Sequence, residues 1–255
     1  MKKRVIYTAI VGVTDSLMQP SVLDPRYDYV CFVAKGGMKE TRQGAWQLRE
    51  IPFTGGDARM QSRYPKMHPD ELFPDYEWTL WMDGNLSIET PEFYSIIDYR
   101  ISAGAQMSAP LHPLRDCIYD EAYAVVASGK GDYASSRRVI RFLRSKGYPR
   151  HAGLFENSIL LRPVGNPAVI AMDSLWWECL QTLAGRDQLS LMYCARECGV
   201  KIDPLLPEGE KLRDCSFLHY VNHDAQPPLP WLADKWRGAR KCIAKWLLRR
   251  QLARI

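Results

Sequence analysis

The stretch WTLWMDGNLSI, residues 78–88, places an acid, a glycine and an amide directly after a run of apolar residues. Such a run predicts a buried strand, which here ends at Asp83-Gly84-Asn85. These three residues are typical of a plain turn, because glycine adopts positive φ and short polar side chains bond their own backbone. Asp83 and Asn85 also offer two oxygen ligands at a strand end, and Mg²⁺ and Mn²⁺ prefer oxygen. From these residues alone, both interpretations stay open.

The composition is that of a globular protein. The 255 residues can bury a substantial core, and 46% hydrophobic and 25% charged residues are ordinary proportions. Seven cysteines without a CxxC pair predict reduced, mostly buried thiols and a cytoplasmic location rather than a disulfide framework. The opening run MKKRVIYTAIVGV is short and rich in β-branched residues, so a first buried strand is expected rather than a signal peptide. No apolar stretch reaches the roughly 18–20 residues of a spanning helix.

Strand and helix patterns alternate along the chain. Strands are predicted at 4–12, 28–34, 77–82, 104–110, 153–162 and 200–205, and helices at 57–64, from residue 90, and at 115–128, 132–146, 166–182 and 186–199. This order predicts a single Rossmann-like α/β domain over residues 1–226, with a mainly parallel sheet covered on both faces. Ligands bind such sheets beyond the carboxyl ends of the strands. The PPLP run at 227–230 is the predicted linker to a C-terminal tail.

Six segments together resemble a known family. They are YTAIVGVTD (7–15), SRYPKMHPDELFP (62–74), WTLWMDGNLSI (78–88), HPLRDCIYDEA (112–122), GLFENSILLR (153–162) and RDQLSLMY (186–193). As a set they resemble the glycosyltransferase-like family of bacterial surface-polysaccharide loci and plant mucilage-related proteins, formerly a domain of unknown function. The order of acidic motif, Asn-containing strand, Asp-Gln pair and late His is also similar to glycosyltransferase family eight. The resemblance covers about residues 5–223 and implies a GT-A fold.

The resemblance implies a metal site for Mn²⁺ or Mg²⁺. Asp83 and Asn85 would bind the ion, and His219 would complete its shell, with His223 as the reserve candidate. Asn85 stands where the family's acidic motif more often has a second Asp. The site therefore has one anionic ligand fewer, which weakens the expected metal affinity.

The same resemblance implies a nucleotide-sugar donor, with UDP as the expected nucleotide. The segment Tyr7-Thr8-Ala9-Ile10 would hold the nucleoside through its backbone. Arg59, Arg63 and Lys66 would contact the diphosphate, because guanidinium groups suit phosphate. Arg59 and Arg63 share a helix face, since they are four residues apart, and a solvated face is the alternative interpretation of that pair.

Three further residues are implied to act at the donor sugar. Asp187 would orient a hydroxyl or support positive charge at the anomeric carbon, Gln188 would assist by hydrogen bonding, and Asn157 would lie at the sugar edge. The charged run with His112, Arg115, Asp116 and Glu121 is either the acceptor side of the site or a surface helix.

The predicted function is metal-assisted transfer of a sugar from a nucleotide-sugar to a cell-surface glycan or lipid-linked acceptor, with retention of configuration if the family-eight likeness extends to mechanism. Two other classes stay open. One is a non-catalytic module that binds nucleotide-sugars or membranes. The other is a ceramidase-like lipid amide hydrolase. The sequence counts against this class, because it has no dense His/Asp zinc cluster and no GxSxG motif.

The net charge of +5 belongs to the tail. Residues 231–255 hold eight Lys/Arg against one Asp, so the remainder of the chain is slightly acidic. The pattern over 231–250 predicts a basic amphipathic helix with tryptophans on its apolar side, which suits an anionic membrane surface at the inner face of the cytoplasmic membrane. Docking on the protein's own body is the alternative. No nucleic-acid partner is expected, because the body offers no continuing basic surface.

Overall fold

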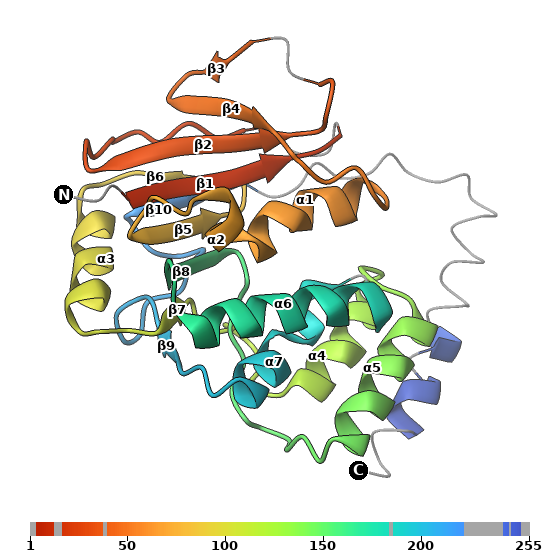
Figure 1. Ribbon diagram of the computed structural model, residues 1–255. Coiled ribbons are helices and arrows are strands. Elements are labelled where there is room, and N and C mark those ends of the chain that lie inside the picture. Colours follow the sequence, from red (N-terminus) through yellow and green to blue (C-terminus); the bar gives the residue numbers. More distant parts are fainter. Residues whose placement is uncertain are drawn as a thin grey trace.

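An eight-stranded mixed sheet lies at the centre of the computed structural model, which describes residues 4–12, 17–37, 40–183, 186–221, 242–244 and 246–250 (Figure 1). The strand order is β3-β4-β2-β1-β5-β8-β7-β9. The strands are β1 (Arg4–Ile10), β2 (Tyr27–Val33), β3 (Arg42–Gln43), β4 (Trp46–Glu50), β5 (Trp78–Met82), β7 (Met107–Ala109), β8 (Ile159–Pro163) and β9 (Ile202–Pro204). β1 pairs in parallel with both β2 and β5, so the predicted α/β class with a mainly parallel centre is confirmed.

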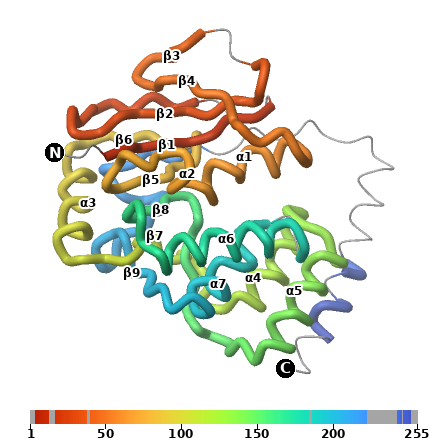
Figure 2. The backbone as a smooth tube through the Cα atoms, in the orientation of Figure 1, coloured from red at the N-terminus to blue at the C-terminus, as the bar shows by residue number. Residues whose placement is uncertain are grey.

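Alternation along the strands produces two hydrophobic layers. On β1, Val5 and Tyr7 face one core and Ile6 faces the other, as period-2 side-chain geometry requires. The first core packs against α1 (Ala58–Met67), α4 (Ile118–Ala127), α5 (Tyr133–Ser145), α6 (Pro167–Thr182) and α7 (Leu191–Glu197). The second packs against α3 (Glu92–Ser102) and a small sheet of β6 (Leu86–Ile88) and β10 (Leu218–Tyr220). Figure 2 shows α4–α7 grouped together, with α3 set apart from them.

Two predicted helices differ clearly from the structure, and some short strands were not predicted. The helix at 57–64 runs instead from Ala58 to Met67, with Pro65 inside its last turn, followed by the short α2 (Pro69–Leu72). The helix at 186–199 is divided into a 3₁₀ turn, η1 (Asp187–Leu189), and α7. The edge strand β3 and its neighbour β4 were not predicted, because only Trp46 among their residues is buried and they form no apolar run. Pro65 has no N–H to bond the carbonyl of Gln61, so α1 continues through its last turn with one backbone bond fewer.

The strand predicted at 153–162 is the correction that matters most for function. It is β8, shortened to Ile159–Pro163, and it runs antiparallel to β5 with Met82 opposite Ile159. Residues 156–158 therefore precede a strand rather than belong to one. Because β8 is antiparallel, its amino end reaches the same edge of the sheet as the carboxyl end of β5, which places Asn157 beside the Asp83 turn.

The tail is described only in part. The predicted linker at 227–230 and the first half of the predicted amphipathic helix lie outside the described residues. Residues 242–244 and 246–250 are helical and lie beside α5 (Figure 1). Leu248 is fully buried, and the Arg249 guanidinium lies 5.4 Å from the ring centre of Tyr123 on α4. This part packs on the body, although Ile243 and Trp246 are more than half exposed. No helix among the described residues is both long and apolar enough to cross a membrane.

Candidate functional site

A cavity of about 810 Å³ opens at the carboxyl end of β5. Residues from α1, the turn after β5, α4, the segment before β8 and the η1 turn form its walls. Its charged lining consists of Arg63, Lys66, Arg115, Lys130, Arg186 and Arg213 together with Asp83, Asp120, Glu121, Glu156 and Asp187. This is the edge at which open α/β sheets bind ligands.

Lys66 is the buried centre of the charged network. It is only 1% exposed, yet its Nζ lies 2.7 Å from Asp187 Oδ2 and 3.7 Å from Asp83 Oδ1. The rings of Trp81 and Trp176 flank the ammonium at 5.4 and 6.0 Å, a distance at which cation–π attraction acts. The continuation of α1 through Pro65 is what turns this lysine inward, three residues and almost one helical turn after Arg63.

Asp187 is held ionised by its neighbours. Burial alone would raise the pKa of its carboxyl group, but Lys66 and Arg63 outweigh burial and hold the pKa well below its usual range. The Arg63 Nε lies 3.4 Å from the same oxygen, Oδ2. The backbone oxygen of Asp187 accepts from Trp176 Nε1 at 2.9 Å, which fixes the η1 turn against α6. Asp187 is thus engaged by two cations before any ligand enters.

Positive charge is in excess on this wall. Burial, together with repulsion from Arg63 and Arg59, lowers the pKa of the Arg186 guanidinium, despite attraction from Asp187. Within the described residues, the buried Nε of Arg186 has no hydrogen-bond partner. Crowded guanidinium groups favour a multiply charged anion, and guanidinium forks match phosphate oxygens.

The Asp83-Gly84-Asn85 segment is both a turn and a cavity wall. The turn closes by a bond from Leu86 N to Asp83 O, and Asp83 N donates to Ser158 O at 2.8 Å. Trp81 Nε1 donates to Asp83 Oδ1 at 2.8 Å and orients the carboxylate. Any side chain at Gly84 would meet Ile10, since an added Cβ would lie 2.3 Å from Ile10 Cδ1.

Asn85 joins this turn to the end of the domain. Its Nδ2 donates to Val221 O at 2.7 Å, and its backbone oxygen accepts from Val221 N. The side-chain oxygen of Asn85, Oδ1, is the atom left for a ligand. Asp83, Asn85 and Glu156 all line the cavity and offer oxygen donors, which fit Mg²⁺ or Mn²⁺. His219 does not join them: it is exposed on β10, opposite Ser87, whereas its neighbour Tyr220 lines the cavity.

The segment before β8 presents polar groups to the cavity. Asn157 is 5% exposed, and neither end of its amide has a partner among the described residues. Gln188 instead is committed to the backbone: its Nε2 donates to Phe155 O, and its Oε1 accepts from Asn157 N at 3.3 Å. Gln188 therefore positions the segment, and Asn157 keeps its amide for a ligand.

Glu156 is a cavity residue to which the sequence interpretation assigned no role. Burial raises the pKa of its carboxyl group, and the nearby Asp83 and Glu121 raise it further, whereas Arg213 at 3.1 Å and His112 oppose the shift. A raised pKa makes the ionised carboxyl group a stronger proton acceptor. The signal in the sequence that could have indicated Glu156 as a site residue is its position next to Asn157 in the GLFENSILLR segment.

The opposite wall contains most of the charged run at 112–121. Arg115 Nε and His112 Nε2 lie 2.5 and 3.4 Å from Glu121 Oε2. Burial would raise the Glu121 pKa, but these two partners outweigh it and lower the pKa. His112, Arg115 and Glu121 all line the cavity, whereas Asp116 is exposed and pairs with His151 outside it.

The β1 residues and Arg59 do not line this cavity. Tyr7 is fully buried, and its hydroxyl accepts from Arg162 Nη2 at 2.7 Å, so it belongs to the core. Thr8 is buried, Ala9 and Ile10 are half-buried, and Thr8 and Ile10 lie against Gly84. Arg59 is exposed at the start of α1. His223 lies outside the described residues.

Comparison with known proteins gives two similarities. A family model described as TOD1/MUCI70, glycosyltransferase-like domain, matches residues 1–206. An Arabidopsis thaliana protein named "Probable hexosyltransferase MUCI70" is 25% identical over 161 residues, which cover 58% of this chain and 27% of that protein. The chain thus spans about a quarter of the length of this curated relative. The family match includes every cavity residue named above except Arg213 and Tyr220.

Proposed function

The chain belongs to the TOD1/MUCI70 glycosyltransferase-like domain family, and we propose that it transfers a hexosyl group from a nucleotide-sugar to a cell-surface glycan or lipid-linked acceptor. The observation that supports this most directly is the excess of positive charge at the end of β5, next to a buried amide that has no partner among the described residues. Arg63, Lys66 and Arg186 suit a diphosphate, and Asn157 suits a sugar hydroxyl.

Charge stabilisation of the leaving group is the proposed source of catalysis. As the bond from the anomeric carbon to the diphosphate breaks, negative charge grows on the phosphate oxygens beside Arg63 and Arg186. Cationic donors already fixed in a cavity stabilise that charge without further reorganisation. Mn²⁺ or Mg²⁺, held by Asp83 and Asn85, would add positive charge at the same place.

Glu156 is the proposed group for proton transfer from the acceptor hydroxyl. Its raised pKa and its place between the Asp83 turn and the Glu121 wall support this role. Asp187 would act through Lys66 rather than on the sugar. Both of its close partners, Lys66 and Arg63, belong with Arg186 to the phosphate wall, the cluster of cations proposed to bind the diphosphate. The Tyr7–Ile10 segment is the proposed nucleoside side, since Thr8 and Ile10 lie against Gly84 in the Asp83 turn.

Donor binding and turnover test the proposal. The full chain is melted with UDP-, GDP-, CMP- and dTDP-sugars, with and without Mn²⁺, and release of the free nucleotide (UDP, GDP, CMP or dTDP) is followed. A ligand that binds only the folded state raises Tm. We expect a metal-dependent rise with one nucleotide class, lost in Asp83→Ala and kept in Asp75→Ala, an exposed acid outside the cavity.

The outcomes separate the three function classes. Turnover of a nucleotide-sugar supports the transferase. A Tm rise without turnover under any acceptor identifies a binding module, and amide hydrolysis without any donor effect identifies a lipid hydrolase. Failure of every nucleotide-sugar to bind the folded protein would overturn the proposal.

The tail is proposed to contact an anionic membrane through residues 231–250, next to a catalytic domain of residues 1–226. Ile243 and Trp246 are exposed, and the Arg250 guanidinium lies 4.5 Å from the Trp246 ring centre, which supports this placement. The protein should sediment with vesicles that contain phosphatidylserine but not with phosphatidylcholine vesicles. Trp246→Glu should reduce sedimentation without lowering Tm, and equal sedimentation of both proteins would contradict the proposal.

A further inference from the structure

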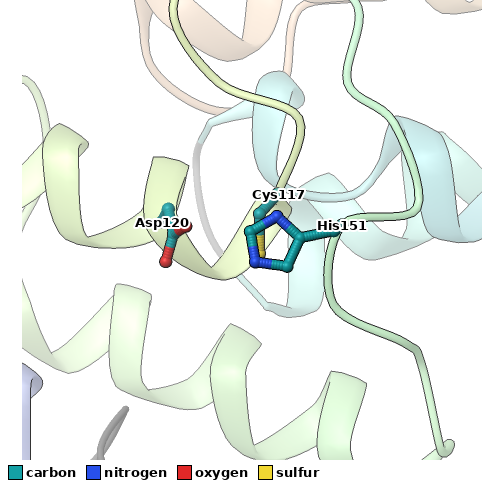
Figure 3. Close-up of side chains that lie close together, drawn as sticks. All are labelled: Cys117, Asp120 and His151. Carbon is teal, nitrogen blue, oxygen red and sulfur yellow. The ribbon is translucent and has the colours of Figure 1, made fainter.

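Three side chains of metal-binding type meet at the start of α4, outside the residues assigned to sugar transfer. Cys117 is the N-cap residue of α4, and Asp120 lies one turn further along the helix. His151 comes from the loop between α5 and β8, and Figure 3 shows its ring beside Cys117. Their sulfur, oxygen and nitrogen atoms all lie within 4.8 Å of one another. Two segments that are distant in sequence, the start of α4 and the loop that bears His151, thus bring one ligand atom of each kind to one point.

The His151 ring is oriented by a carboxylate. Its Nδ1 lies 2.8 Å from Asp116 Oδ1, and this contact lowers the pKa of the Asp116 carboxyl group. With Nδ1 occupied, Nε2 is the nitrogen available to a metal. Metal-binding histidines usually donate their other ring nitrogen to a carboxylate or carbonyl in this way, because it fixes the tautomer and the ring direction.

The loop that bears His151 is fastened to the same helix start. Arg150 Nη2 donates to Asp120 Oδ1 at 2.9 Å, which leaves Asp120 Oδ2, and Gly153 N donates to Asp116 O at 3.0 Å. His151 has a φ of 51°, which lies in the left-handed region. No other non-glycine residue in the described ranges has a positive φ. That conformation is unfavourable for a residue with a Cβ and is maintained by these contacts.

We propose that Cys117, Asp120 and His151 bind a zinc ion, with water in the fourth position. A thiolate, an imidazole and a carboxylate are zinc ligands, whereas Mg²⁺ and Mn²⁺ prefer oxygen. Bond lengths of about 2.0–2.3 Å place tetrahedral ligands roughly 3.3–3.8 Å apart. Closing from at most 4.8 Å requires a movement of about 1 Å, which the surface side chains of Asp120 and His151 can make around the buried Cys117.

Proton and charge balance are simple for this site. Zinc binding releases the Cys117 thiol proton to solvent, and the thiolate and the Asp120 carboxylate together neutralise the two positive charges of the ion. His151 binds as a neutral ring. Affinity therefore falls as the pH is lowered, because protons compete for the thiolate and the imidazole.

The site would lock the 150–153 loop to the first turn of α4. Asp120 also lines the 810 Å³ cavity, and its neighbour Glu121 belongs to the charged wall. The proposal does not depend on sugar transfer, since the ligand set and the test below involve only the metal and the protein.

Cobalt provides the direct test, because Co²⁺ bound by a thiolate gives a charge-transfer band in the near ultraviolet and Zn²⁺ displaces it. The full chain, stripped with a chelator, is titrated with Co²⁺ and then with Zn²⁺. We expect a one-to-one charge-transfer band that zinc abolishes, and a zinc-dependent rise in Tm. Asp116→Asn should weaken zinc binding by about tenfold to a hundredfold, since it removes the group that orients His151.

Matched variants locate the metal. Cys117→Ser should remove the band, and His151→Ala, which changes an exposed side chain, should remove it or weaken binding at least tenfold without loss of the fold. Cys242→Ser removes an exposed thiol, and Asp83→Ala removes the ligand proposed for Mn²⁺ or Mg²⁺; both should leave the band unchanged. A folded wild-type protein without the band, or a band that persists in His151→Ala with unchanged affinity, would overturn the proposal.

Discussion

Replacing Lys66 by methionine should destabilise the protein far more than the loss of one side-chain contact. Lys66 is buried and lies 2.7 Å from Asp187 Oδ2. At an effective dielectric constant of 20, that separation corresponds to a gross attraction of about 6 kcal/mol, which the cost of burying both charges largely offsets. The substitution leaves Asp187 charged and buried, and breaking a buried pair from one side costs about 3–5 kcal/mol.

Thermal unfolding of a matched set of proteins measures this effect. For a chain of this size, each kcal/mol shifts Tm by about 2–4 °C, so Lys66→Met should lower Tm by roughly 6–20 °C. Asp187→Asn should cost a similar amount. The double variant, which removes both charges, should be more stable than the sum of the single effects predicts. It should nevertheless lose donor binding, because the phosphate wall lacks its central cation.

The pH dependence provides a second check on the same pair. The Asp187 pKa is lowered in the folded state, so its contribution to stability is complete above the ordinary Asp pKa near 4 and is lost as the pH falls below it. The difference in unfolding free energy between wild type and Asp187→Asn should therefore shrink between about pH 5 and about pH 3. Single variants within about 1 kcal/mol of wild type, or strictly additive costs, would refute the buried-pair argument.

Three other substitutions test separate parts of the structure. Arg186→Met should keep or raise Tm, since it relieves repulsion among the guanidinium groups. The same substitution should weaken nucleotide-sugar binding at least tenfold, as measured by titration calorimetry. A large loss of Tm would contradict the proposed excess of charge. Glu156→Gln should raise the unfolding free energy at neutral pH and lower turnover. The stability gain should disappear as the pH falls through the raised pKa, because the wild-type carboxyl group then becomes neutral as well. A gain that is constant with pH would contradict this. Asp173→Ala should cost about 3–5 kcal/mol in urea unfolding, because it leaves the fully buried Arg162 without the carboxylate that it contacts at 2.7 and 2.8 Å; a cost below about 1 kcal/mol would refute that role.

The sequence was sufficient for the central strands and for part of the cavity lining. Apolar runs located β1, β2 and β5, and the rule that ligands bind beyond the carboxyl ends of parallel strands led to Asp83. The position of Lys66 was not predictable in this way, since Pro65 is normally a sign that a helix has ended. Whether α1 continues is decided by packing of its last turn, which local preference does not contain.

His219 and Glu156 illustrate two other limits. Side chains alternate along the strand β10, so His219 and Tyr220 must face opposite sides of it. Only the pairing of β10 with β6 decides which of the two sides meets the cavity. Glu156 reaches the site because β8 is antiparallel. Strand direction depends on contacts between distant parts of the chain, and no local pattern in GLFENSILLR encodes it.

The bond between Asn85 and Val221 has a practical consequence for domain boundaries. Any fragment or chimera cut at residue 206, where the family similarity stops, would retain all eight strands of the main sheet. It would nevertheless lack β10, leave the edge of β6 without its partner, and remove Arg213 and Tyr220 from the cavity. An open strand edge favours self-association. Expression vectors and domain swaps built from this fold should therefore extend past residue 221.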